Sequence, residues 1–157
     1  MWWRSSVTKL CFAALFLAGI LWASEWHWWV LANPFPLLFV LFYLVSASVL
    51  RFGSESFQVL YVALRRCFKP RTALPSPALS AKVHAQLKAQ RRYCYSAGLA
   101  GFVIGAITIQ FFAGQAEQIP NYQYAYAANM LPLWYAFVLA EFVLAPTLQA
   151  WRQGFRA

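Results

Sequence analysis

The sequence contains little charge and very little acid. Of its 157 residues only 11% are charged, and 4 acidic residues stand against 13 Lys and Arg. Soluble domains average about 25% charged residues, so the composition argues against a soluble enzyme and against a disordered tail. The few histidines and acidic residues are scattered and show neither a metal-ligand spacing nor a catalytic constellation. We therefore expect no enzyme activity, no metal and no cofactor.

Several motifs that carry chemistry are also missing. The sequence contains no His-x-x-Glu-His pattern, no nucleophile elbow and no phosphate-binding glycine loop. Cysteine is limited to 3 residues, Cys11, Cys67 and Cys94. We expect one of them inside the membrane and two at its cytoplasmic, reducing side, which argues against a disulfide-stabilised scaffold.

Apolar residues are abundant instead. They make up 62% of the chain, with 19% aromatic residues and a mean hydropathy of +0.52. About 20 helical residues cross a bilayer, and four segments are close to or above this length: 8–30, 34–51, 95–113 and 124–149. We interpret the first as a transmembrane span rather than a cleaved signal peptide. The sequence therefore predicts an all-α polytopic membrane protein with four transmembrane helices and a single membrane domain, 1–157.

The positive charges define the topology of these spans. All 13 Lys and Arg residues lie on one side of these spans: Arg4 and Lys9 at the start of the first, nine from Arg51 to Arg92 between the apolar parts of the second and third, and Arg152 and Arg156 after the fourth. The positive-inside rule then places both the N and C termini and the loop 52–94 in the cytoplasm. An anionic partner or lipid surface is an alternative explanation of the charge, whereas its position beside apolar stretches argues against nucleic acid. Aromatic residues at 26–29 and 122–126 are typical of the opposite membrane surface.

The cytoplasmic loop has its own helical patterns. Apolar residues recur at helical spacing over 57–68 and predict a helix that continues the second span or lies along the membrane. Two prolines make 69–76 a linker. Ser76 and Pro77 then form a helix start, and no further Pro or Gly occurs before the third span. The sequence predicts one long third helix from Pro77 to Ala113, extended into the cytoplasm.

Small residues recur along the third span. Ala97, Gly101 and Gly105 are spaced by four and form one face of the helix. In lipid such a face allows another helix to approach closely. We interpret it as a helix-packing surface, either against the fourth span within the chain or between subunits.

Glu141 is the one acidic residue in the interior of a predicted span, since Glu25 belongs to the outer end of the first. A carboxylate at the centre of a spanning helix costs about 2.5–3.5 kcal/mol on insertion scales and usually faces a bundle interior or a wet cavity. One hypothesis is that Glu141 handles an ion or proton. The other is that a cytoplasm-side cation, Lys9 or Arg51, neutralises it and that it serves packing. Pro132 and Pro146 further perturb this helix.

Two segments carry a resemblance to a known family. In the fourth span its landmarks are Leu131, Tyr135, Leu139, Ala140 and Pro146, followed by Arg152. This span resembles the last span of flagellar stator A-subunits of the MotA/TolQ/ExbB family. The run from Gly98 to Gly105, Gly-Leu-Ala-Gly-Phe-Val-Ile-Gly, is similar to Gly-Leu-Ile-Gly-Thr-Leu-Ile-Gly of that family, and the exit of the second span at 49–52 also has a counterpart.

The resemblance implies a stator-like subunit in the inner membrane of a bacterial cell. Such a subunit belongs to an ion-driven motor or energiser complex that uses protons or sodium. The resemblance also implies a homo-oligomer, pentameric in the family, around a single-span B-type (MotB/ExbD-like) partner with a titrating membrane Asp. On this interpretation the ion pathway or lumen is lined by Glu141, Thr108, Gln110, Tyr135 and Pro132.

The chain also departs from the family pattern. Pro132 and Leu133 replace the two Thr of the fourth span, and Phe102 replaces the Thr of the third. Tyr95 stands where the family has Pro, and Glu141 where it has Asn. The large cytoplasmic domain is reduced to 52–94. Because the missing hydroxyls line the family's ion route, two alternatives stay open: a non-conducting scaffold subunit of a membrane complex, and a small membrane transporter without an evident site.

Overall fold

The described part of the chain consists of helices joined by short turns. The computed structural model describes residues 2–58, 61, 77–113 and 122–153, and no β-strand occurs in these ranges. The principal elements are α1 (Trp2–Ala23), the 3-10 helix η1 (Trp28–Ala32), α2 (Pro34–Phe52), α4 (Pro77–Ala113), α5 (Tyr122–Val138), the π-helix η2 (Leu139–Leu144) and α6 (Ala145–Gln153). The all-α class predicted from the sequence is therefore confirmed.

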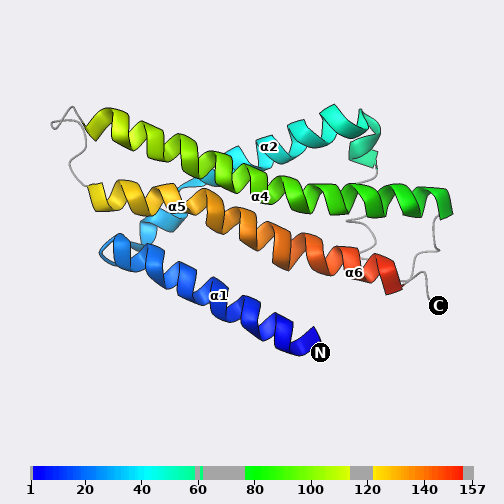
Figure 1. The fold of residues 1–157 in the computed structure, drawn as a ribbon, viewed down its shortest axis with the longest axis horizontal. Coiled ribbons are helices and arrows are strands. Elements are labelled where there is room, and N and C mark those ends of the chain that lie inside the picture. Colours follow the sequence, from blue (N-terminus) through cyan, green and yellow to red (C-terminus); the bar gives the residue numbers. More distant parts are fainter. Residues whose placement is uncertain (1, 59–60, 62–76, 114–121, 154–157) are drawn as a thin grey trace.

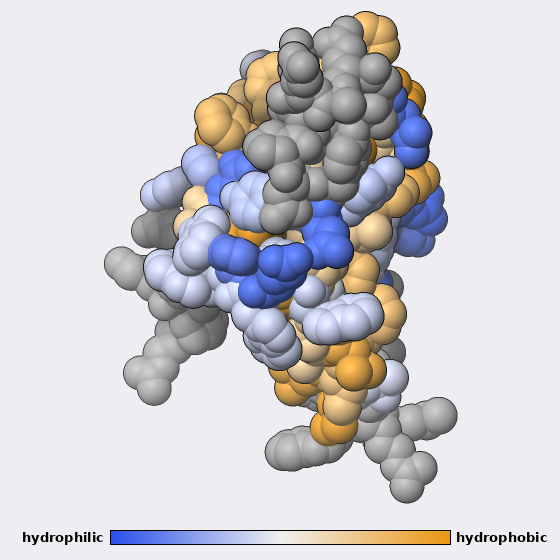
Figure 2. Space-filling model, turned by 90° about the vertical axis from the view of Figure 1, so that its left-hand side faces the viewer, coloured by the Kyte–Doolittle hydropathy of each residue, from blue (hydrophilic) through white to orange (hydrophobic). Residues whose placement is uncertain are grey.

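The helices α4, α5 and α1 lie side by side in this order, with η2 and α6 following α5 along α4, and α2 crosses behind α5 and α4 and contacts both (Figure 1). The N-terminus, the end of α2, the start of α4 and the end of α6 share one end of the molecule (Figure 1). The turn after α1, the end of α4 and the start of α5 share the other end. Seen from that second end, hydrophilic side chains gather near the centre while apolar ones cover much of the flanks (Figure 2).

The first apolar segment is divided by a turn. α1 ends at Ala23, because Glu25 and Trp26 adopt left-handed backbone angles with φ of 54° and 64°, which end a helix. The amide of Trp26 donates to the carbonyl of Leu21 at 2.7 Å and closes the turn. The expected span 8–30 is thus a helix to residue 23, followed by a turn and η1, so Trp28 and Trp29 lie outside α1.

The second and third long helices begin at proline. α2 starts at Pro34, and the Asn33 side chain caps it by accepting from the amide of Phe35 at 3.1 Å. It ends at Gly53, whose φ of 68° suits glycine. α4 runs from Pro77 to Ala113, so the predicted long helix is confirmed at both bounds. The predicted Ser76 cap, the linker 69–76 and most of the 57–68 helix fall outside the described residues.

Three helical segments among the described residues are long and apolar enough to cross a membrane. They are Trp28–Phe52, Ala78–Phe112 and Gln123–Gln149, while Val7–Ala23 in α1 is a shorter apolar helix. Many large apolar side chains on these helices are exposed, among them Phe42 at 75% and Leu50 at 88%. Such an apolar surface is expected of a chain that resides in a membrane.

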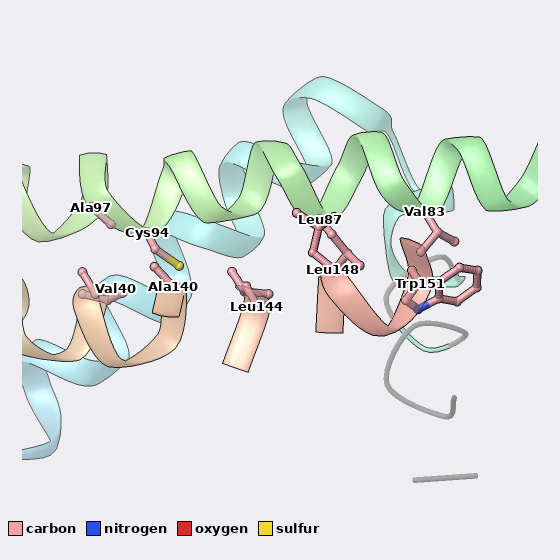
Figure 3. Packing of buried hydrophobic residues seen from close by; sticks show 10 residues of the cluster. Val40, Val83, Leu87, Cys94, Ala97, Ala140, Leu144, Leu148 and Trp151 are labelled. Carbon is pink, nitrogen blue, oxygen red and sulfur yellow. The ribbon is translucent and has the colours of Figure 1, made fainter. Parts of the chain in front are cut away.

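The main core lies between α4 and the last two helical segments. Val83, Leu87 and Cys94 of α4 face Leu144, Leu148 and Trp151 (Figure 3). The α4 members recur at helical spacing, so one face of α4 is buried along its length. The cytoplasmic half predicted for this helix therefore does not stand alone but packs on α6.

Candidate functional site

Glu141 lies in a local change of helix type. Residues 139–144 form a π-helix in which the amide of Ala145 donates to the carbonyl of Ala140, one residue beyond the α-helical spacing. Pro146 follows directly; a proline has no N–H and its ring crowds the carbonyl four residues earlier. The wider turn relieves this crowding, and π-turns frequently occur at functional sites.

The carboxylate of Glu141 is buried, with 6% of the residue exposed, and three side chains contact it. Oε1 accepts from Arg91 Nε at 3.0 Å, from Arg91 Nη2, and from the Tyr95 hydroxyl at 2.5 Å. Oε2 forms an ion pair with Lys9 Nζ. We call Glu141, Lys9, Arg91 and Tyr95 the Glu141 cluster.

The cluster compensates the cost of burying a charge. An isolated buried carboxylate is strongly unfavourable, whereas one paired with cations and hydrogen bonded is tolerated. The two cations leave the cluster with a formal charge of +1, and their side chains stay 31% (Lys9) and 39% (Arg91) exposed. Both cations are thus partly exposed, whereas the carboxylate is almost fully buried. Because Lys9 comes from α1 and Arg91 from α4, the cluster ties three helical segments together.

Of the two cations that the sequence offered as partners of Glu141, one contacts its carboxylate and the other does not. Lys9 pairs with Glu141, but Arg51 donates instead to the Tyr93 hydroxyl at 3.3 Å and lies over the Phe52 ring at 5.5 Å. The sequence reasoning missed Arg91 and Tyr95. Their spacing of four places both on one face of α4, which is the signal that could have identified them.

The other predicted lining residues do not join the Glu141 cluster. The hydroxyl of Thr108 donates to its own helix at Ile104, and Gln110 donates to the Tyr126 hydroxyl at 3.2 Å. The Tyr135 hydroxyl donates to the carbonyl of Leu31 at 2.8 Å, which links α5 to η1. Pro132 packs against glycines of α4. Thr108 and Pro132 line one groove between α2, α4 and α5, whereas Gln110 and Tyr135 do not line it.

The small-residue face of α4 packs within the chain. Ala97 is fully buried. A Cβ built on Gly101 would lie 2.8 Å from Pro132, and one built on Gly105 would lie 1.8 Å from Asn129 Oδ1. The close approach that small residues permit is therefore made by α5 of the same chain. Of the two interpretations, packing against the fourth span and packing between subunits, the structure shows the first.

A groove lies beside this contact, between α2, α4 and α5. Its volume is about 350 Å³, and its lining includes Phe35, Phe39, Gly101, Gly105, Thr108 and Asn129. Asn129 is 7% exposed, and its Nδ2 is buried without a hydrogen-bond partner. The groove is thus mostly apolar, with one unused donor in its wall.

The described residues hold no group of three or more His, Cys, Asp or Glu side chains suited to a metal ion. Comparison of the chain with protein-family models, with curated proteins and with solved structures finds no match. The resemblance to stator A-subunits therefore rests on the sequence motifs described above.

Proposed function

We propose that the chain is a non-conducting scaffold subunit of a membrane complex, in which Glu141 locks helices together instead of carrying ions. The supporting observation is the Glu141 cluster: Oε1 accepts hydrogen bonds from Arg91 and Tyr95, and Oε2, which accepts no hydrogen bond, is ion paired with Lys9. A carboxylate that binds and releases ions needs a free coordination site and a polar route. The other polar residues predicted to line an ion route, Thr108, Gln110 and Tyr135, lie away from the Glu141 cluster and form separate hydrogen bonds.

The proposal includes the membrane arrangement. α1 crosses the inner membrane of a bacterial cell as a fourth span, with both termini on the cytoplasmic side. The chain assembles as a homo-oligomer around a single-span partner, as its motifs resemble those of stator A-subunits. In favour of α1 as a span, its 22 residues correspond to about 33 Å, and Lys9 anchors it to Glu141.

A second candidate is an ion-driven, stator-like subunit. The observation that favours it is the π-helix at 139–144, because such turns occur at functional sites and can shift register. In this case Glu141 would exchange its present partners for a proton or sodium ion.

Ion uptake by vesicles from the native membrane separates the two candidates, since any partner subunits are then present. We expect equal uptake of protons and sodium with the natural chain and with Glu141→Gln. Glu55→Gln is the matched control, because Glu55 forms an exposed ion pair with Lys82, with side chains 67% and 64% exposed. Uptake that Glu141→Gln abolishes while the variant chain still folds and assembles in the membrane, and that Glu55→Gln preserves, would establish the ion-driven function instead.

A further inference from the structure

The Glu141 cluster borders an open groove between α1 and α5. The groove has a volume of about 480 Å³ and is lined by Thr8, Lys9, Phe12 and Phe137. The Phe12 and Phe137 rings contact each other with their centroids 5.1 Å apart, and Phe12 is exposed. The groove thus combines apolar side chains with Lys9, which also pairs with Glu141. A basic pocket between membrane helices is suited to the head group of an anionic lipid.

The two cations of the cluster have donors left for such an anion. The hydrogen bonds to Glu141 use Nε and Nη2 of Arg91, so they leave its Nη1 amino group unused. The Lys9 ammonium group has three protons to donate and forms one ion pair with Glu141. Both cationic side chains are partly exposed, whereas the carboxylate is not. A ligand can therefore reach the cations from outside the helix bundle.

Both cations lie where their helices change from charged to apolar sequence. The apolar segment of α1 begins at Val7, directly before Lys9. In α4, Arg91 and Arg92 are the last charged residues, and the sequence from there to Ala113 is uncharged. Lipid head groups lie where a spanning helix passes from apolar to charged residues. The position of the cluster along its helices therefore suits a lipid phosphate.

We propose that an anionic phospholipid binds at this site, with its phosphate beside Lys9 and Arg91 and an acyl chain along Phe12 and Phe137. The formal charge of +1 on the Glu141 cluster complements the single negative charge of such a lipid. This inference rests on the proposed function, in which Glu141 stays charged and paired, and adds a lipid to the helices that Glu141 holds together. Inorganic phosphate would meet the same cations but would leave the aromatic wall of the groove uncovered.

The positions of the acidic residues favour a lipid over a second copy of this chain. The acids among the described residues are Glu25, Glu55 and Glu141. Glu25 belongs to the turn after α1, at the end of the molecule opposite the N-terminus (Figure 1). A head-to-tail pair that brings Glu25 to Lys9 would need two copies of opposite topology, against the positive-inside rule. Glu55 is already paired with Lys82.

Competition between two lipids tests the proposal on the full chain. The purified chain in non-ionic detergent receives equal amounts of phosphatidylglycerol and phosphatidylcholine with the same acyl chains, and native mass spectrometry identifies the first lipid retained. We expect phosphatidylglycerol to bind about fivefold more tightly, because one unit charge near an anionic head group contributes about this factor. Inorganic phosphate in large excess should leave the ratio unchanged.

Two variants of one ion pair should change this preference in opposite directions. Lys9→Gln makes the cluster formally neutral and should abolish the preference. Glu141→Gln leaves two cations and should raise the preference by about a further fivefold. Both variants break the pair between Lys9 and Glu141, so damage to the fold would lower the preference in both. Circular dichroism of each variant checks that its helices are retained.

The matched controls make the same changes of charge in the exposed pair of Lys82 and Glu55. Lys82→Gln and Glu55→Gln should each keep the preference of the natural chain. If Glu141→Gln does not fold, the comparison of Lys9→Gln with Lys82→Gln decides. The proposal would be overturned by any of three results: no preference in the natural chain, an equal loss in Lys9→Gln and Lys82→Gln, or displacement of the lipid by inorganic phosphate. A folded Glu141→Gln chain with a weaker preference would overturn it as well.

Labelled copies of the natural chain, without added lipid, test the remaining occupant. Self-association that Lys9→Gln abolishes and Lys82→Gln preserves would assign the groove to a second copy and would overturn the proposal. None of these results bears on ion uptake, so a failed lipid assignment leaves the scaffold function standing. Conversely, uptake that depends on Glu141 would overturn the scaffold function whatever lipid is retained.

Discussion

Arg91 of α4 and Glu141 of the π-helix pair across the main helix interface, with Arg91 Nε 3.0 Å from Glu141 Oε1. Lys9 reaches the other oxygen from α1. The same carboxylate thus holds the longest helix and the N-terminal helix against the last helical segments. Because these contacts bury a charge, their removal should be measurable as lost stability.

Replacing Glu141 by Gln should lower the stability of the folded chain by about 2–4 kcal/mol. The substitution leaves Lys9 and Arg91 without their counter-charge, and their partial exposure keeps the cost below that of fully buried cations. Thermal unfolding in detergent measures the effect. Glu55→Gln breaks an exposed pair and should cost less than about 1 kcal/mol. Equal melting temperatures for the two variants would contradict a structural ion lock.

Replacing Tyr95 by Phe should cost about 1–2 kcal/mol, since it removes a hydrogen bond to a charged acceptor. The ring remains, so the packing of α4 is unchanged. Tyr93→Phe is the matched control, because the Tyr93 hydroxyl accepts only a 3.3 Å contact from Arg51 on the exposed surface. Melting of both variants is compared, and a larger loss for Tyr93→Phe would speak against the Glu141 cluster.

Replacing Lys9 by Met should loosen α1 more than any other helix. α1 packs mainly on α5, through ring contacts such as Phe12 with Phe137 and Phe16 with Trp134. Lys9 adds the ionic contact to Glu141. Hydrogen exchange should therefore accelerate in α1 and not in α4. Lys88→Met, on the exposed side of α4, should leave the exchange of α1 unchanged; uniform acceleration would indicate a global effect instead.

Replacing Gly98 by Ala should destabilise the chain by about 1–3 kcal/mol through overpacking. The new Cβ would lie 2.7 Å from the Ala136 Cβ and 3.1 Å from the Pro132 carbonyl oxygen, so the backbones of α4 and α5 would have to separate. Gly19→Ala is the control in α1, where nothing lies within 4 Å. It should be neutral or stabilise by up to about 1 kcal/mol. Melting temperatures that fall equally would refute the close packing of α4 on α5.

The helices could be predicted from the sequence where local signals decide them. Pro77 and the absence of breakers defined α4, and Pro34 began α2. The end of α1 could not be predicted, because left-handed angles at Glu25 and Trp26 are uncommon for such residues. The π-helix at 139–144 was also not predicted. A proline in the sequence indicates that the helix is perturbed, but it does not indicate which pattern of backbone hydrogen bonds the helix then adopts.

The sequence by itself determined that an apolar chain with a single intramembrane carboxylate needs compensation for Glu141. Composition and segment length suffice for that conclusion, because the cost depends on the surroundings and not on a specific partner. Only the tertiary structure decided that Lys9, Arg91 and Tyr95 provide the compensation and that Arg51 does not. Which side chains reach Glu141 depends on the order of the helices and on the rotation of each helix about its axis. Both follow from packing over the whole interface between α4, α5 and α1.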